Sequence, residues 1–145
     1  MMHDDLVVTS TVGIDASAER VWAVITDTEA AREYLFGARF EADWRVGGAL
    51  RWSGTWQGRP YEDHGTVLEI DPPRRLVHTH FSPRRTSGLE PDDHHTLTWT
   101  IEGEADGPSV LSLSQDNNAT PESAAHAKRV WDSLVAKVKE IAERA

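Results

Sequence analysis

The last part of the chain constrains the fold most, because it has the pattern of one long amphipathic helix. Thr120, Pro121 and Glu122 provide an N-cap, a proline at the first helical position and an early acid. Apolar residues with helical spacing then form one stripe: Ala127, Trp131, Leu134, Val135, Val138, Ile141 and Ala142. A helix with one apolar stripe must bury it against another layer, so the rest of the chain has to supply that surface.

Alternating segments earlier in the chain predict that the surface is a β-sheet. The β-branched run 6–14 predicts a first strand, and further strands are expected over 39–44, 50–56, 62–70, 76–81, 96–102 and 109–115. Gly47-Gly48 and Asp71-Pro72-Pro73 are short turn signals, so neighbouring strands should pair antiparallel. Gly54 predicts a bend or bulge in its strand. The segment 82–93 is predicted to be an exposed loop.

The predicted fold is therefore α+β, with a curved antiparallel sheet of about seven strands packed on the long C-terminal helix. Two short helices, over 18–26 and 29–35, are expected between the first and second strands, with Ser17 and then Asp27 or Thr28 as N-caps. The 145 residues contain no repeat or linker, so a single domain, 1–145, is expected.

Composition excludes several functions. A net charge of −9 argues against nucleic acid or an anionic membrane as the main partner. The absence of cysteine excludes disulfides, thiolate metal sites and a thiol nucleophile. The first ten residues lack the blocks of a signal peptide and no apolar run is long enough for membrane insertion, so a cytoplasmic protein is expected.

Several motifs carry a resemblance to a known family, and these are Ser17-Ala18-Glu19-Arg20-Val21-Trp22 with Thr26-Asp27, Val46-Gly47-Gly48 with Trp52, and Gly65-Thr66-Val67-Leu68-Glu69-Ile70-Asp71-Pro72-Pro73-Arg74-Arg75-Leu76-Val77. By these motifs the chain resembles the helix-grip superfamily of START and Bet v 1-like proteins (SRPBCC). Within it, the chain is similar to the branch named after the activator of the 90-kDa heat-shock protein ATPase. The resemblance implies a bent sheet that grips the last helix, with a cavity between them for lipids, polyketides or other apolar molecules. It does not imply one activity, because fold and function are separable.

Five of the six tryptophans fall on the predicted inner surfaces. Trp44, Trp52, Trp56 and Trp99 lie on strands, and Trp131 lies on the helix stripe one turn before Leu134. They could simply fill the core. Large indoles with N–H groups that need partners pack imperfectly, however, so together with the resemblance they favour a ligand cavity.

Histidines form the second candidate group. His78 and His80 share a strand face with Leu76, which the resemblance implies is the inward face, and His64 is expected to point inward from the neighbouring strand. Three convergent imidazoles could bind a metal or transfer protons. Polar groups that contact water or ligand are the better interpretation, so no metal and no cofactor are predicted.

Two further groups concern the edge of the cavity. Tyr34 and Phe36 end the second short helix, a region that borders the cavity entrance in helix-grip proteins. The Tyr34 hydroxyl could contact a ligand or donate a proton, or the residue could only hold the helices to the sheet. Either Glu62 or Asp63 could reach the cavity mouth.

Three functional hypotheses follow. The first is a non-catalytic binding module for a small apolar or aromatic molecule, because no nucleophile elbow, catalytic triad or phosphate loop is present. The second is a cyclase, dehydratase or hydrolase that uses His78, His80 or Tyr34. The third is a chaperone-cofactor-like interaction module. Strand edges that need cover make a homodimer conceivable.

Overall fold

A seven-stranded antiparallel sheet and a long helix form most of the structure, a computed structural model that describes residues 6–35, 37–56, 58–81, 94–103, 106–118 and 120–144. In chain order the elements are β1 (Leu6–Ile14), α1 (Ala18–Ile25), α2 (Thr28–Tyr34), β2 (Arg39–Ala42), β3 (Ala49–Trp56), β4 (Arg59–Asp71), β5 (Arg75–Phe81), β6 (His94–Gly103), β7 (Ser109–Asn118) and α3 (Pro121–Ala142). The predicted fold class is confirmed. The expected loop over 82–93 lies outside the described residues.

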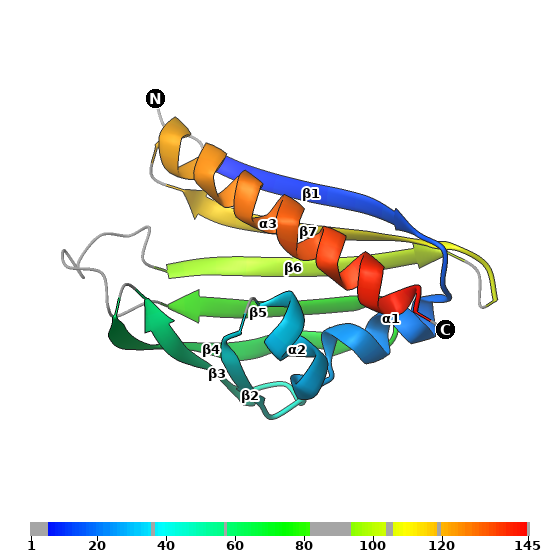
Figure 1. The fold of residues 1–145 in the computed structure, drawn as a ribbon, viewed down its shortest axis with the longest axis horizontal. Coiled ribbons are helices and arrows are strands. Elements are labelled where there is room, and N and C mark those ends of the chain that lie inside the picture. Colours follow the sequence, from blue (N-terminus) through cyan, green and yellow to red (C-terminus); the bar gives the residue numbers. More distant parts are fainter. Residues whose placement is uncertain are drawn as a thin grey trace.

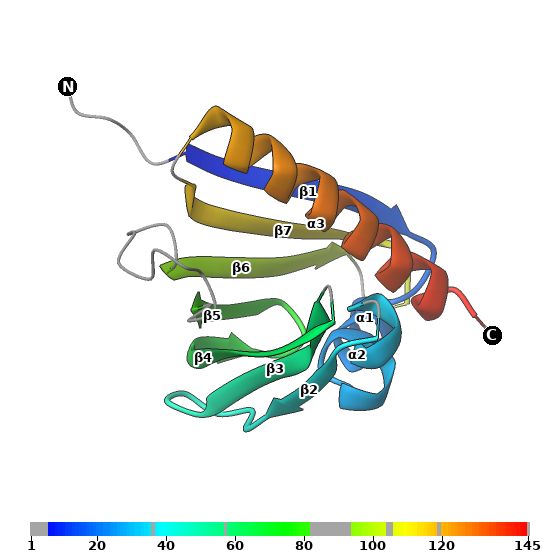
Figure 2. The same ribbon diagram turned by 60° about the vertical axis from the view of Figure 1, so that its left-hand side comes forward.

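The sheet has the order β1-β7-β6-β5-β4-β3-β2, so β2 to β7 form a meander and β1 closes it by pairing with β7. Figure 1 shows α3 crossing one face of the sheet diagonally on the side of β1 and β7 and ending beside α1. Figure 2 shows α1 and α2 at the end of α3, next to β2. The three helices thus lie on one face of a curved sheet.

Local signals set the helix starts where the sequence predicts them. Ser17 Oγ accepts the backbone N–H of Arg20, and the Asp27 carboxylate accepts that of Glu29. Thr120 and Ser123 form a reciprocal capping box at the start of α3, with Pro121 at the first helical position. Each cap satisfies a backbone donor that a helix start leaves unpaired.

Contacts near the middle of α3 and at its C-terminus fix the helix on the sheet. Near the middle, Ser10 Oγ of β1 donates a 2.6 Å hydrogen bond to Asp132. At the C-terminus, Arg20 of α1 donates to the carbonyl oxygens of Ile141 and Ala142 at 3.1 and 3.2 Å. Arg20 therefore supplies donors and positive charge to the negative end of the helix.

The apolar stripe of α3 is buried over most of its length. Leu134, Val135 and Val138 are among its fully enclosed members, and they pack in one core with Leu111 and Leu113 of β7. None of the helices within the described ranges has the length and apolarity that crossing a membrane requires.

The inward face of β4 differs from the prediction. The pairing of β4 with β5 shifts register between Val67 and Glu69, and Val67 is buried whereas Leu68 is 48% exposed. This bulge reverses the alternation, so residues before it face inward at odd numbers. At Gly54, where the sequence predicts a bend or a bulge, there is no bulge, because β3 pairs with β4 without a register shift and Gly54 lies opposite Tyr61.

Candidate ligand-binding cavity

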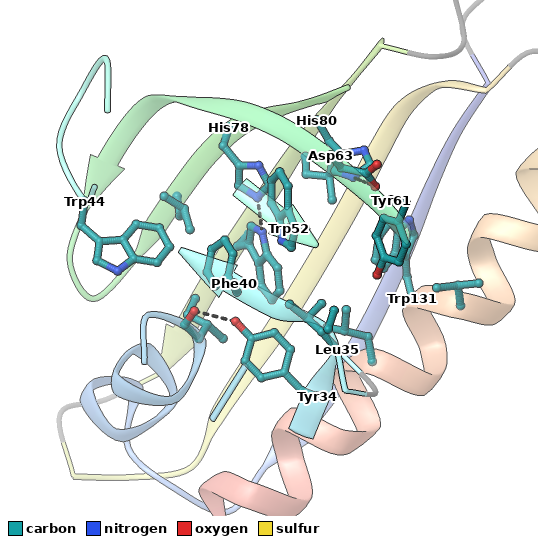
Figure 3. Close-up of a pocket in the computed structure, with 17 residues that line it drawn as sticks. Tyr34, Leu35, Phe40, Trp44, Trp52, Tyr61, Asp63, His78, His80 and Trp131 are labelled. Atoms are coloured by element: carbon teal, nitrogen blue, oxygen red, sulfur yellow. Dashed lines mark hydrogen bonds and ion pairs between the residues drawn. The ribbon is translucent and has the colours of Figure 1, made fainter. Parts of the chain in front are cut away.

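A cavity of about 300 Å³ lies between α2, α3 and the inward face of the sheet (Figure 3). Its lining residues are Ile25, Tyr34, Leu35, Ala38, Phe40, Trp44, Trp52, Tyr61, Asp63, Leu76, His78, His80, Leu97, Trp99, Val130, Trp131 and Leu134. Most of these side chains are apolar or aromatic, and no lysine or arginine is among them. Small-molecule sites in proteins have this composition, with a few placed polar groups.

Trp52 is the centre of the aromatic wall. It stacks on Phe40 with 5.4 Å between ring centroids, and it also contacts the imidazole rings of His78 and His80, at centroid distances of 5.6 and 4.8 Å. Phe40 in turn meets Trp44 edge-on at 5.7 Å. These contacts join β2, β3 and β5 into a continuous ring-lined surface.

Gly65 makes room for this wall. It takes the inward position on β4 between Asp63 and Val67, and a Cβ there would overlap the carbonyl oxygen of Thr79 and lie 3.1 Å from the Trp52 ring. The missing side chain therefore lets Trp52 cross β4 and lets β5 approach closely.

His78 is a buried, fully bonded histidine. The Trp99 indole N–H donates to His78 Nε2 at 3.0 Å, so that nitrogen is an acceptor, and the proton lies on Nδ1, 3.0 Å from the carbonyl oxygen of Thr79. Burial lowers the pKa of His78 to about 4, with the bond to Thr79 opposing this only in part. His78 is thus a neutral acceptor for Trp99, with neither ring nitrogen left for a ligand.

Tyr34 and Trp44 are also bonded within the protein. The Tyr34 hydroxyl donates to the carbonyl oxygen of Ile25 at 2.7 Å, and Trp44 Nε1 donates to that of Thr26 at 3.0 Å. Burial raises the pKa of Tyr34 above its ordinary value. The Tyr34 hydroxyl therefore holds α2 to α1, and only its ring lines the cavity.

His80 and Asp63 form a polar pair in the wall. His80 Nε2 lies 3.1 Å from Asp63 Oδ2, and the side chains are 24% and 14% exposed. Figure 3 shows them together on the opposite side of the cavity from Trp44. β4 and β5 bring them together, because each is an inward residue of its strand.

Trp131 differs from Trp44 and Trp99, whose indole N–H groups are hydrogen-bonded. Its ring lines the cavity from α3, but within the part of the chain that the structure describes its N–H has no hydrogen-bond partner. That nitrogen has less than 1 Å² of accessible surface, so a ligand in the cavity does not reach it in this conformation.

Eight residues predicted for the site line the cavity, and these are Tyr34, Trp44, Trp52, His78, His80, Trp99, Trp131 and Leu134. The prediction for His64 is wrong: the β4 bulge places its side chain outside, 51% exposed and 3.2 Å from Glu62. Phe36 and the side chain of Trp56 lie outside the described residues.

The structure adds residues that the sequence did not single out. Of the two acids considered at the cavity mouth, Asp63 is the one that lines it. Phe40 and Tyr61 were not predicted, although Phe40 shares a predicted strand face with Trp44, a signal that could have found it. Among the described residues, no group of three histidine, aspartate or glutamate side chains is placed to hold a metal ion.

The sheet, the gripping helix and the cavity between them define a protein of the helix-grip fold. The chain belongs to the family described as activator of Hsp90 ATPase homolog 1-like protein, whose model matches residues 15–143. A search of curated proteins gave no match.

Solved structures agree with this assignment. ChR145 from Cytophaga hutchinsonii is 32% identical with a TM-score of 0.82, over 98% of this chain and 97% of that one. DynU16, from the dynemicin biosynthetic locus, is 20% identical with a TM-score of 0.77, over 97% of this chain and 48% of that one. Ara h 8.0201 is 12% identical with a TM-score of 0.74, over 96% of this chain and 98% of that one. The last two similarities concern the fold alone.

Proposed function

We propose that the protein binds a small hydrophobic or aromatic molecule in the cavity between α3 and the sheet. The observation that carries the proposal is a cavity of about 300 Å³ walled by Trp52, Phe40 and other aromatic rings. Its volume is at the lower end of the roughly 300–1,000 Å³ typical of ligand sites, which suits a compact molecule of one to three rings.

The internal hydrogen bonds favour binding over catalysis. A general acid or base must reach the substrate with a titratable atom. The Tyr34 hydroxyl is bonded to Ile25 and both nitrogens of His78 are bonded within the protein, so two of the three groups considered for catalysis are occupied. Of those three groups this leaves His80, which is paired with Asp63.

The test is titration of the folded protein with N-phenyl-1-naphthylamine, a neutral dye whose fluorescence rises in apolar sites. We expect saturable binding and a Val130→Phe variant that binds about tenfold or more weakly, since a larger side chain on α3 takes up cavity volume. The matched control is Val46→Phe, at a valine that is 67% exposed and does not line the cavity, and its affinity should be unchanged.

Circular dichroism spectra of both variants check that they are folded. Equal affinity of Val130→Phe, Val46→Phe and the unmodified chain would place the dye elsewhere on the protein and count against the proposal. So would the absence of saturable binding by the unmodified chain.

A further inference from the structure

The indole N–H of Trp131 is a buried hydrogen-bond donor without a partner among the described residues. Its nitrogen has less than 1 Å² of accessible surface, so water does not satisfy it either. A donor left in this state costs the folded protein free energy, and such groups are rare enough in native structures that each needs an explanation. A molecule that binds nearby and supplies the acceptor is one such explanation.

The unpaired donor belongs to a ring that lines the ligand cavity. Trp131 extends from α3 on the opposite side of the cavity from Trp44 (Figure 3). The residue is only partly buried although its nitrogen is enclosed, so the accessible surface of this side chain is almost all carbon. A tryptophan at the edge of an apolar region usually has the opposite orientation, with its N–H toward water or a polar partner.

A turn of the ring about its side-chain bonds would bring the donor to the cavity surface. In the protein without a ligand, that turn gives up the packing of the buried edge and gains only contact with water. A ligand with an acceptor in the cavity adds a hydrogen bond to the turned state alone. Because a ligand shifts an equilibrium toward the state to which it binds more tightly, such a ligand favours the turned ring.

The chemistry of a single N–H restricts the acceptor that it fits. An indole nitrogen donates and does not accept. One such bond gives a neutral carbonyl oxygen a partner, whereas an ionised carboxylate that leaves water needs several donors. The stacked rings of Trp52 and Phe40 in the same cavity offer contact to the aromatic part of such a molecule.

We infer that the ligand is an aromatic molecule with a carbonyl group, of the aryl ketone type, and that Trp131 turns to donate its N–H to the carbonyl oxygen. This inference rests on the proposed function, because it names the ligand class of the same cavity and the donor that recognises it. The new hydrogen bond also relieves an unpaired donor, so the carbonyl should raise affinity about tenfold.

The test compares 2-acetylnaphthalene with 2-isopropenylnaphthalene as competitors that displace bound N-phenyl-1-naphthylamine. The two molecules have the same shape, but the first has a carbonyl oxygen where the second has a methylene group. We expect the ketone to bind the unmodified chain about tenfold more tightly, although it is the more polar. In Trp131→Phe, which keeps a ring without the N–H, the preference should disappear or reverse, because the carbonyl then leaves water without this partner.

Trp22 offers the matched control. It lies on α1, partly buried against the core, and it does not line the cavity. Trp22→Phe therefore makes the same replacement elsewhere and should leave the tenfold preference intact. Binding of the dye by each variant verifies that its cavity is formed.

A second measurement needs no variant. In a ¹⁵N-labelled chain each of the six tryptophans gives one indole N–H signal, and triple-resonance assignment identifies that of Trp131. Because a hydrogen bond moves the indole proton downfield, the ketone should shift the Trp131 proton downfield relative to the alkene. The Trp22 proton should have the same shift with both ligands.

The outcomes separate the inference from the function on which it rests. If the dye binds and the two competitors displace it equally well, or neither displaces it, the carbonyl assignment is overturned and the apolar cavity function stands. A preference that survives in Trp131→Phe would assign the carbonyl to another donor, such as the Trp52 indole or the Tyr61 hydroxyl, and overturn the role of Trp131. If neither the dye nor the two naphthalenes bind, both proposals fail.

Discussion

A single residue, His78, links the core to the cavity. It provides an acceptor for the indole N–H of Trp99 in the cavity wall, and it is buried with both ring nitrogens bonded within the protein. A buried imidazole without these partners would cost roughly 1–3 kcal/mol per unsatisfied group. The bonds therefore satisfy the polar edges of the two rings that pack at the cavity.

His78 makes the free energy of unfolding depend on pH. In the unfolded chain its pKa returns to about 6.5, whereas in the folded protein it is about 4, so between these values the unfolded state binds more protons. Stability attributable to His78 is then complete above about pH 6.5 and declines as pH falls toward 4, by about 3 kcal/mol in total. Urea unfolding at a series of pH values measures this decline.

The matched variants are His78→Gln and His126→Gln. The glutamine carbonyl at 78 can accept from Trp99 but does not titrate in this range, so the slope between pH 4 and 6.5 should flatten. His126 is exposed on α3, and its replacement should leave the slope as it was. An unchanged slope in His78→Gln would contradict the assignment.

Among the elements, β4 is the strand whose inward face differs from the one predicted from the sequence. Caps and apolar periodicity predicted the helices, because those signals are local to Ser17, Asp27 and Thr120. The bulge at Val67–Glu69 depends on how β4 pairs with β5, and adjacent apolar residues Val67 and Leu68 hide it in the sequence. Because of that one shift, Asp63 lines the cavity and His64, which was predicted to point inward, lies outside it.

The close approach of β4 and β5 at Gly65 predicts a strong dependence on residue size. Gly65→Ala should lower the free energy of unfolding by about 1–3 kcal/mol or more, because the new Cβ overlaps backbone of β5 and presses on Trp52. Gly13→Ala in β1 is the control. Apart from its chain neighbours, no heavy atom lies within 4 Å of the position that a Cβ would take at Gly13. Alanine there should leave the free energy of unfolding unchanged or raise it by up to about 1 kcal/mol. Chemical denaturation measures the free energy of unfolding of both variants. Similar losses in Gly65→Ala and Gly13→Ala would contradict the close approach of β4 and β5 at Gly65.

The whole molecule depends on how α3 is held over the cavity. Arg20 binds the last carbonyl oxygens of the helix, and Arg144, just beyond α3, forms a two-pronged ion pair with Glu33 of α2 at 2.6 and 3.0 Å. The short helices therefore attach the end of α3 to the β2 side of the sheet. The sequence predicted which elements exist and that α3 covers the sheet. These side-chain contacts link positions more than a hundred residues apart, and no local pattern predicts them.

Removal of the Arg20 contacts should loosen α3 from its C-terminus. We expect Arg20→Met to destabilise the protein by about 1–2 kcal/mol, from two lost hydrogen bonds and the lost charge at the helix end. Hydrogen–deuterium exchange should accelerate over 139–142 more than over 127–131. Arg129→Met, at an exposed arginine of the same helix, should change neither region. Uniform acceleration along α3 in Arg20→Met would contradict this attachment.

The pairing of β1 with β7 has a consequence for synthesis on the ribosome. Residues 6–14 emerge before the other strands of the sheet, yet their hydrogen-bonded neighbours are residues 109–118, and the helix that covers the cavity is made later still. During translation the strands of the meander can pair as they appear. β1 remains unpaired, with one apolar face uncovered, until β7 has been made. The nascent chain is therefore exposed to misassociation until α3 has left the exit tunnel.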